Sequence, residues 1–284
     1  MANIAFLGTG LLGAAFAEAA AKRGDTVTAW NRSPDKVLAL AGFGIKQAPT
    51  PAEAVRGAAR VHIVLKDDAA VDEAIAAARP GLAADAVLID HSTTLPRLTA
   101  ERAARLHAQG IKYLHCPVFM GPPAARTARY LMIAAGPRAV FESVQADLAR
   151  MTGRLEFVGE RTDLGAVDKL LGNAMIIGAW AVMADVLTLP KACGVEAEEA
   201  VKLLGTIDMN AMISRRGSTM AKGDFTPNFE LVMARKDVRL MLEMSEGASM
   251  AVLPAVASRM DQLIAAGHGT KDASVMAVDA VRRG

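Results

Sequence analysis

The sequence is poor in cysteine, and its charges nearly cancel. It contains only 2 cysteines, Cys116 and Cys193, which form no CxxC pair. We therefore expect two reduced structural thiols in packed surroundings, not a redox or zinc-binding motif. The formal net charge is +2, which is too small to indicate nucleic acid or an anionic membrane as the main partner. The expected partner is a small molecule.

Signatures of several other protein classes are also missing. The 5 histidines form no HxxH or HxxxH pair, and no GxSxG motif is present, so we expect neither a metal site nor a serine hydrolase. The start, MANIAFLGTG, lacks the features of a secretory signal, which predicts a cytoplasmic protein. The one membrane-like run begins at residue 174 and is interrupted at Asp185, short of the roughly 18 residues that a span needs. It predicts a buried helix.

The first half of the chain alternates short β-branched runs with Ala-rich helical segments. Strands are predicted at residues 3–8, 26–30, 61–66, 86–91, 112–118, 130–136 and 155–159. This alternation is typical of a parallel sheet with helices on both faces. From about Thr162 onward, helical periodicity continues without another β-rich run and is broken at Gly194, at 223–228 and at 265–270. We therefore predict an α/β domain, residues 1–162, followed by an all-helical domain, residues 163–284.

The first predicted strand runs directly into the letters GTGLLG and then into a helix. Gly8 permits a tight turn, Gly10 lets the backbone approach a pyrophosphate, and Gly13 allows close helix packing. Leu11 and Leu12 complete the loop and begin the helix, whose N-terminus would face the anion. The motif in this context predicts a dinucleotide-binding site.

The end of the second predicted strand distinguishes NAD from NADP. An acidic residue there would hold the ribose 2′-hydroxyl of NAD, but the chain has Asn31, Arg32 and Ser33. A guanidinium with short polar donors suits a 2′-phosphate. We therefore predict NADP as the cofactor, with NADPH preferred over NADH. Asn31 and Ser33 could instead cap the next helix, which would leave Arg32 unexplained.

Lys169 stands at the head of a long apolar run, in GAVDKLLGN. On a helix it shares a face with Asn173, four residues later, and Gly165 leaves room beside it. Such a pair suits carbonyl reduction: as hydride adds to carbon, an ammonium donates a proton to the oxygen and an amide holds that oxygen. In the reverse direction the neutral amine would be the base, and burial would help by lowering its pKa. The alternative is a lysine that merely extends from a helix end into water.

Five segments together carry a family resemblance. They are GTGLLG, DHSTTLP (90–96), GAVDKLLGN (165–173), the pair Lys236-Asp237 and GHGTKDAS (267–274). In this order, over nearly the whole chain, they resemble the β-hydroxyacid dehydrogenase family. The resemblance implies a Rossmann domain followed by an all-α domain with a long interdomain helix, and a homodimer or homotetramer formed through the helical domain. It also implies hydride transfer between NADPH and a small aldehyde or 3-hydroxy acid.

The resemblance implies roles for particular residues near the substrate. Lys169 matches the catalytic lysine of the family, and Asn173 matches an amide that helps bind the substrate. Ser92 and Thr93 match a pair beside the nicotinamide and the substrate. Both could instead cap the helix that is predicted to begin near Leu95.

Further roles implied by the resemblance concern the cofactor. Leu65 and Lys66 match a loop that passes the adenosine and the nicotinamide ribose. Lys236 matches a lysine near the cofactor, and Asp237 matches its neighbour that positions the helix. These assignments add to the glycine loop and to the predicted phosphate-binding residues.

The chain departs from the family at the substrate loop. The family typically reads Pro-Val-Ser-Gly-Gly, whereas this chain has Phe119, Met120 and Gly121 after Pro-Val, followed by two prolines that lack backbone N–H groups. We predict that these three residues bind the substrate, with weaker capture of a carboxylate. Gly172 also stands where the family often has the first of two asparagines.

These departures leave alternatives open. Arg126, Arg129 or Asp208 could take over polar recognition, although either arginine could also be a solvated surface residue. Imine reductases share the two-domain arrangement and usually carry aspartate or tyrosine at the position of Lys169, so the retained lysine favours an alcohol or aldehyde. The apolar pair Phe119-Met120 keeps a hydrophobic carbonyl or imine substrate open. A module that holds NADP without turnover is the remaining alternative.

Overall fold

The computed structural model describes residues 2–281, which form two compact units. The units divide after Asn173, inside helix α8 (Leu164–Thr188); we call them the N-terminal unit and the helical unit. The hydrophobic pattern places the boundary before this helix. The first turns of α8, however, pack on the N-terminal unit, where a Cβ at Gly165 would lie only 2.9 Å from His115 Nδ1. The packing in the structure therefore places the boundary after Asn173, later than the boundary after residue 162 that the sequence pattern predicts.

The N-terminal unit is built on a nine-stranded sheet with the order β3-β2-β1-β4-β5-β6-β8-β7, in which β9 pairs with β8. Neighbours from β3 to β6 are parallel, whereas β8 runs antiparallel to β6 and β7. The strands are β1 (Asn3–Leu7), β2 (Thr26–Trp30), β3 (Lys46–Gln47), β4 (Arg60–Ile63), β5 (Val87–Asp90), β6 (Lys112–His115), β7 (Val118–Phe119), β8 (Leu131–Ala135) and β9 (Arg154–Gly159). The predicted α/β class is confirmed. The predicted strand 112–118 is wrong in one respect, because it breaks into β6 and β7 around Pro117, which has no N–H to donate.

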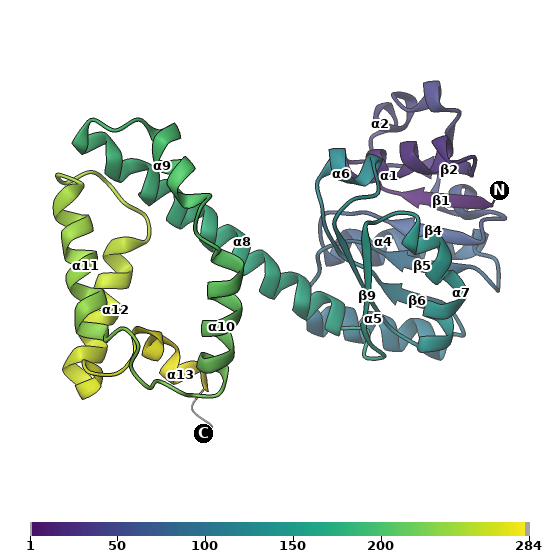
Figure 1. The fold of residues 1–284 in the computed structure, drawn as a ribbon. Coiled ribbons are helices and arrows are strands. Elements are labelled where there is room, and N and C mark those ends of the chain that lie inside the picture. The colour runs from purple at the N-terminus through teal and green to yellow at the C-terminus, as the bar shows by residue number, and fades with distance from the viewer. Residues whose placement is uncertain (1, 282–284) are drawn as a thin grey trace. The chain divides into compact units, whose positions relative to one another are not determined.

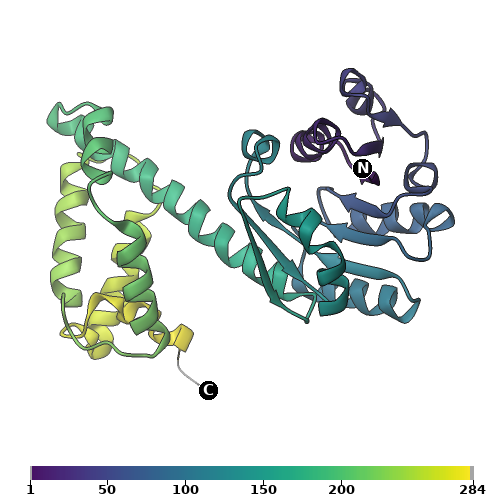
Figure 2. The ribbon, with the colours of Figure 1, turned by 45° about the vertical axis from the view of Figure 1, so that its right-hand side comes forward.

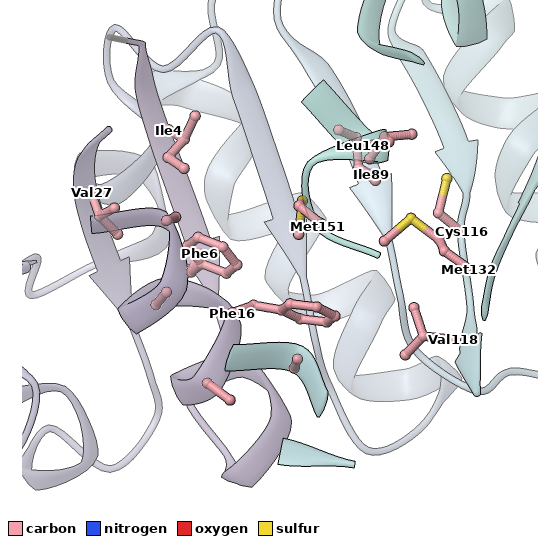
Figure 3. Close-up of a cluster of buried hydrophobic side chains, with 14 of the residues drawn as sticks. Ile4, Phe6, Phe16, Val27, Ile89, Cys116, Val118, Met132, Leu148 and Met151 are labelled. Carbon is pink, nitrogen blue, oxygen red and sulfur yellow. The ribbon is translucent and has the colours of Figure 1, made fainter. Parts of the chain in front are cut away.

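Helices cover both faces of this sheet (Figures 1 and 2). They are α1 (Leu11–Lys22), α2 (Asp35–Leu38), α3 (Pro51–Val55), α4 (Asp68–Ala78), α5 (Pro96–Ala108), α6 (Pro122–Arg126) and α7 (Arg138–Ala149). Successive residues of β1 point to opposite faces, so Phe6 packs with α1 and α7, and Leu7 packs with α3, α4 and α5. Figure 3 shows the first of these cores, with Phe16 of α1 beside the strands. Two covered faces explain why the strands read as continuous apolar runs.

The helical unit contains the end of α8 and α9 (Ala197–Leu204), α10 (Met209–Ala221), α11 (Leu231–Met244), α12 (Leu253–Leu263) and α13 (Val278–Val281). Its core forms mainly between α11 and α12, and a short π-helical turn, Ile264–His268, follows α12. The predicted breaks are confirmed: Gly194 ends a 3-10 turn in the left-handed conformation, and Gly267 has a φ of 84°. Among described residues 164–281, all regular segments are helical.

The carboxyl-terminal part of α8 is exposed in the single chain, so the expectation of a buried helix is wrong. Met175, Ile177 and Trp180 are 55%, 58% and 69% exposed. By length and composition alone, residues Leu164–Cys193 could cross a membrane, with a mean hydropathy of 1.7. Core helices of soluble proteins, which are mostly buried, also reach this length and hydropathy. The exposure runs all round this part of the helix, because residues 174–180 are all exposed.

The end of α8 is tied into the helical unit by Asp185. Its buried carboxylate accepts backbone N–H groups at 2.6, 2.8 and 2.8 Å from Ala251, Val252 and Leu253, at the start of α12. These bonds lower the pKa of Asp185 against the opposing effect of burial. The two cysteines are free, as predicted, but only Cys116 is packed, because Cys193 is exposed.

Candidate active site

The turn between β1 and α1 has the shape that its glycines require. Gly8 adopts a φ of +100°, and a Cβ there would lie 2.2 Å from the carbonyl oxygen of Val64. A Cβ at Gly13 would lie 2.1 Å from the carbonyl oxygen of Gly8. Both positions exclude side chains because the protein's own backbone occupies the space.

Gly10 differs from these two glycines because no protein atom lies within 4 Å of where its Cβ would be. It is the N-cap residue of α1, and no side chain caps the N-terminal N–H groups of that helix. Leu11, in the first turn, is 84% exposed, whereas Leu12 packs partly against the core. An open backbone surface with free N–H donors at a helix N-terminus fits a pyrophosphate.

A cavity of about 270 Å³ extends from this loop along the carboxyl ends of β2 and β4. It gathers the predicted cofactor residues Gly10, Asn31, Arg32, Ser33, Leu65 and Lys66, together with Lys36 and Glu73. Neither Asn31 nor Ser33 caps α2, whose N-cap residue is Pro34. Asn31 instead accepts the N–H of Thr9 at 3.0 Å, which holds the glycine loop to the end of β2. The residues and the space together fit the adenosine end of a dinucleotide.

Arg32 is exposed in this cavity and forms an ion pair with Glu73 of α4, with 2.7 Å between Nη2 and Oε2. Glu73 is not recognisable from the sequence, because it lies 41 residues from Arg32 and carries no motif. A guanidinium on an exposed ion pair exchanges partners at little cost, because such pairs contribute little stability. Arg32 is therefore available to bind a phosphate, and Glu73 competes with that phosphate for Arg32.

Ser92 and Thr93 follow β5 and have different environments. The buried Ser92 Oγ accepts the backbone N–H of Leu65 at 3.0 Å, which joins the loops after β4 and β5. Thr93 is exposed. Neither residue caps α5, whose N-cap residue is Leu95. Ser92 thus shapes the loop, and Thr93 is free to meet a ligand.

A buried polar network holds the Ser92 loop from behind. Asp90 accepts the N–H of Ser92 at 2.9 Å and the phenol of Tyr113 at 2.8 Å. Burial raises the pKa of Tyr113, so the phenol remains a donor. Arg102 lies nearby, 3.8 Å from Asp90, and binds two carboxylates of α4. This network is not among the residues predicted from the sequence, although Asp90 stands at the strand end two residues before Ser92.

Two buried histidines, His62 and His91, form a second hydrogen-bonded group beneath the same loop. His91 Nδ1 lies 2.7 Å from the carbonyl oxygen of Cys116 and therefore donates to it. Its Nε2 then accepts from His62 Nδ1 at 3.0 Å. Burial lowers the pKa of His91 to about 4 and lowers the pKa of His62, so the pair stays neutral and structural.

Lys169 projects from the first turns of α8 toward the end of the sheet. Its Nζ donates to the carbonyl oxygen of Val118 at 2.7 Å and lies 4.1 Å from the centre of the Phe119 ring. The side chain is half-buried, and burial lowers the pKa of Lys169. This geometry rules out a lysine that simply extends into water. Asn173 lies one turn later, partly exposed.

Gly165 and Gly172 border Lys169 on the same helix. Gly165 makes room for β6, because a Cβ there would meet His115 and Pro117, so its space is not left for a ligand. A Cβ at Gly172 would lie 2.3 Å from Cζ of Phe119. Phe119 is thus packed between Lys169 and Gly172.

Two family models match the chain. The model of the NAD-binding domain of 6-phosphogluconate dehydrogenase matches residues 3–159, and the model described as NAD-binding of NADP-dependent 3-hydroxyisobutyrate dehydrogenase matches residues 164–278. The chain belongs to the β-hydroxyacid dehydrogenase family. The predicted family is confirmed, and the chain is an NAD(P)-dependent oxidoreductase.

Relatives of known activity cover nearly the whole chain. It is 27% identical to glyoxylate/succinic semialdehyde reductase 2 of Arabidopsis thaliana, over 97% of this chain and 78% of that protein. It is 28% identical to 3-sulfolactaldehyde reductase of Escherichia coli, over 97% of this chain and 95% of that protein. A reductive aminase from Aspergillus terreus, solved with NADPH and ethyl levulinate, shares the fold with a TM-score of 0.89 at 23% identity, over 99% and 100% of the two chains.

The side chains of residues 118–120, in the segment predicted to bind the substrate, alternate between the two faces of the sheet. Val118 is buried in the core, Phe119 points to the opposite face toward α8, and Met120 packs partly against the core again. Gly121 is exposed and is the N-cap residue of α6. Of the three predicted substrate-loop residues, the structure places only the Phe119 side chain beside Lys169.

The arginines after this loop separate into two kinds. Arg126 donates to the buried carboxylate of Glu18 at 2.6 Å and thereby ties α6 to α1. Arg129 lines an open cavity of about 720 Å³ together with Phe119 and Tyr130. Its neighbours Ala128 and Tyr130 have left-handed backbones, with φ values of 51° and 68°.

The remaining predicted residues lie in the helical unit. Lys236 and Asp237 of α11 form an ion pair at 2.8 Å, and both are partly exposed. Asp208 caps α10 by accepting the N–H of Ala211 at 2.9 Å, which gives it a structural role. Among described residues 2–281, no three His, Cys, Asp or Glu side chains gather in a way that could hold a metal ion.

Proposed function

We propose that the chain is an NADP-dependent reductase that transfers hydride from NADPH to the carbonyl carbon of a small aldehyde, and catalyses the reverse oxidation of a 3-hydroxy acid. The observation that carries the proposal is the half-buried Lys169, held at the carbonyl of Val118 in the unit that contains the glycine loop. The semialdehyde and sulfolactaldehyde reductases among its relatives support this substrate class.

Bound NADPH supplies the hydride, and the chain manages the proton. As the carbon–oxygen double bond accepts hydride at carbon, its electron pair moves to oxygen, and the Lys169 ammonium donates a proton there. The neutral amine that remains is reprotonated from water. Asn173, one turn later on the same helix face, holds the oxygen through its amide N–H. In the reverse direction the neutral Lys169 amine removes the hydroxyl proton.

The proposed preference for NADPH rests on Arg32. Its guanidinium, with Lys36 and Lys66 in the same cavity, provides positive charge where a 2′-phosphate would bind. Glu73 is the opposing carboxylate. Lys66 also pairs with its neighbour Asp67, at 3.2 Å. Three cations against these two acids favour the phosphorylated cofactor.

The test is a spectrophotometric screen of NADPH and NADH oxidation. Substrates include glyoxylate, succinic semialdehyde, tartronate semialdehyde and methylmalonate semialdehyde, with apolar aldehydes and cyclic imines alongside. Lys169→Ala is expected to lower turnover by about 10²- to 10⁴-fold while NADPH affinity stays the same, because it removes only the proton donor. The matched control is Lys112→Ala, which removes an exposed lysine at the first residue of β6. Tight NADPH binding without turnover on any substrate would leave a cofactor-binding module, and full activity of Lys169→Ala would remove the proposed donor.

A second candidate is reduction of a hydrophobic carbonyl or an imine. The observation that favours it is the Phe119 ring directly beneath the Lys169 ammonium. The imine reductases and reductive aminases with the same fold are less than 25% identical and support the architecture only. Turnover of cyclic imines above that of every aldehyde in the screen would favour this candidate.

We also propose that a second copy of the chain covers the exposed part of α8, residues 174–180. Met175, Ile177 and Trp180 are exposed apolar side chains on neighbouring turns of α8, and contiguous exposed apolar surface often marks a site of protein–protein contact. Further exposed apolar residues lie on α10 and α11, including Ile213 and Met241. Sedimentation equilibrium over a range of protein concentrations measures this association. A monomer at all concentrations would contradict it.

A further inference from the structure

The position of Phe119 follows from strand pairing. In the antiparallel pair of β7 and β8, Phe119 lies opposite Leu131, and Val118 lies opposite Met132. Val118 and Met132 are both buried in the core. Because side chains alternate along a strand, Phe119 must point to the other face, where the first turns of α8 lie. The aromatic ring is therefore fixed in place by the sheet.

The ring carries the ammonium of Lys169 on its face. Nζ lies 4.1 Å from the ring centre, and the same Nζ donates to the carbonyl oxygen of Val118, the preceding residue. A cation over an aromatic face is attracted by the negative centre of the ring. The proton donor is thus positioned by one backbone carbonyl and one aromatic ring from the same two-residue strand.

Gly172 shows that the ring occupies space that a helix side chain would use. A Cβ at this position would lie 2.3 Å from Cζ and 2.5 Å from Cε1 of Phe119. Glycine inside a helix costs about 1 kcal/mol relative to alanine, so a steric requirement explains its presence here. Phe119 and Gly172, separated by more than 50 positions, are therefore one paired feature: the ring requires the glycine.

This pair changes the chemistry beside the proton donor. A carboxylate placed next to Lys169 would meet the negative face of an aromatic ring. Pro122 and Pro123, at the start of α6, contribute no N–H groups that could solvate it. A carboxylate there would lose hydration and would have to take its hydrogen bonds from the Lys169 ammonium, which the reaction needs at the carbonyl oxygen, whereas an apolar group on the ring loses little hydration.

We propose that Phe119, with Gly172 behind it, is the specificity-determining residue of this enzyme. It selects carbonyl substrates whose group next to the reacting carbon is flat and apolar, and it disfavours a carboxylate at that place. The inference rests on the proposed reductase function and narrows its substrate class. An acidic group farther along the substrate is compatible with it, because Arg129 lies in the open cavity that Phe119 also lines.

The kinetic test compares benzaldehyde with glyoxylate, which carries a carboxylate directly on the reacting carbon. Wild-type enzyme is expected to give the higher kcat/KM with benzaldehyde, and Phe119→Ser to change the ratio of the two constants by about 10-fold or more toward glyoxylate, roughly the discrimination that an apolar pocket provides. The matched control is Phe43→Ser, because a lysine, Lys22, also lies over that ring, at 5.0 Å. A ratio that is unchanged in Phe119→Ser, or a wild type that prefers glyoxylate, overturns the inference and leaves the reductase function intact.

The steric pairing has a separate readout in thermal unfolding. Gly172→Ala is expected to lower the unfolding temperature in the wild-type background and to be tolerated in the Phe119→Ser background. Gly217→Ala, in α10 with no atom near its Cβ, is the helical control. Equal destabilisation by Gly172→Ala in both backgrounds overturns the pairing.

If the wild-type enzyme turns over neither of these two aldehydes, the wider substrate screen still decides the proposed function, and the inference is decided by binding. The NADPH complex is then titrated with acetophenone and with glyoxylate, and the rise in unfolding temperature is measured. Stronger stabilisation by acetophenone that is lost in Phe119→Ser supports the inference. Stronger stabilisation by glyoxylate, or no stabilisation by either, overturns it.

Discussion

The glycine loop at Gly8–Gly13 and the segment at Phe119 that we propose meets the substrate lie at the ends of strands in one sheet, but different atoms determine their shapes. At Gly8 and Gly13 the missing side chains would collide with backbone carbonyl oxygens, at 2.2 and 2.1 Å. At Gly172 the missing side chain would collide with the ring of Phe119. A backbone atom cannot be substituted away, whereas a ring can. The first loop therefore tolerates one residue type, and the second can change by paired substitution.

The largest effect is expected from a substitution that disrupts the glycine loop itself. Gly8→Ala is expected to destabilise the protein by about 3 kcal/mol or more, because alanine must adopt a φ of +100° and its Cβ meets the Val64 carbonyl. Thermal or denaturant unfolding measures the loss, and the yield of soluble protein is a second readout. A Gly8→Ala protein as stable as the wild type would show that the loop has more freedom than its contacts indicate.

Gly10→Ala is the control that separates folding from binding at the same loop. Its backbone has an ordinary φ of −65°, and open space surrounds the Cβ position. We expect unchanged unfolding without cofactor and a loss of NADPH affinity of about 10-fold or more, because the methyl group would occupy the pyrophosphate's approach. Unfolding as severe as that of Gly8→Ala would contradict the open site.

The next effect concerns which nucleotide is bound. Arg32→Ala is expected to weaken NADPH by about 10- to 100-fold, the loss of charge-assisted hydrogen bonds to a 2′-phosphate, and to change NADH little. Fluorescence titration with both cofactors measures the ratio. Glu73→Gln, which removes the partner of Arg32, is expected to raise the preference for NADPH. A ratio unchanged in both variants would refute the phosphate assignment.

Much of the nucleotide side is predictable from sequence because its constraints are local. Gly8, Gly10 and Gly13 lie within six residues, and the strand and helix around them are read from short patterns. The helical position of Lys169 is local too. Glu73 was not predictable, because its contact with Arg32 joins the end of β2 to α4, 41 residues later in the sequence.

The substrate side was less predictable because its main contact is distant in sequence. The fit of Phe119 against Gly172 becomes visible only when β7 and α8 are placed together. One signal was available: alternation beyond Val118 puts Phe119 and Met120 on opposite faces. The predicted strand ended at Val118, so Met120 was grouped with Phe119 although it packs against the core.

The smallest expected effect, and the one that separates cofactor binding from proton donation most cleanly, is pH dependence. Burial lowers the pKa of Lys169, so the folded enzyme loses its ammonium at a pH below the ordinary range of lysine. The rate of reduction is expected to fall as pH rises through that lowered pKa, about tenfold per pH unit above it, while the rate of oxidation rises.

Arg32→Ala, on the nucleotide side, and Lys169→Ala, beside Phe119, should respond differently in this measurement. Arg32→Ala alters cofactor affinity only, so its kcat at saturating NADPH should fall along the same alkaline limb as the wild type. Lys169→Ala has no donor to lose, so the small activity that remains should lack the limb. An alkaline limb retained in Lys169→Ala would assign the proton to another group. It would also leave Lys169 with only a structural contact to Val118.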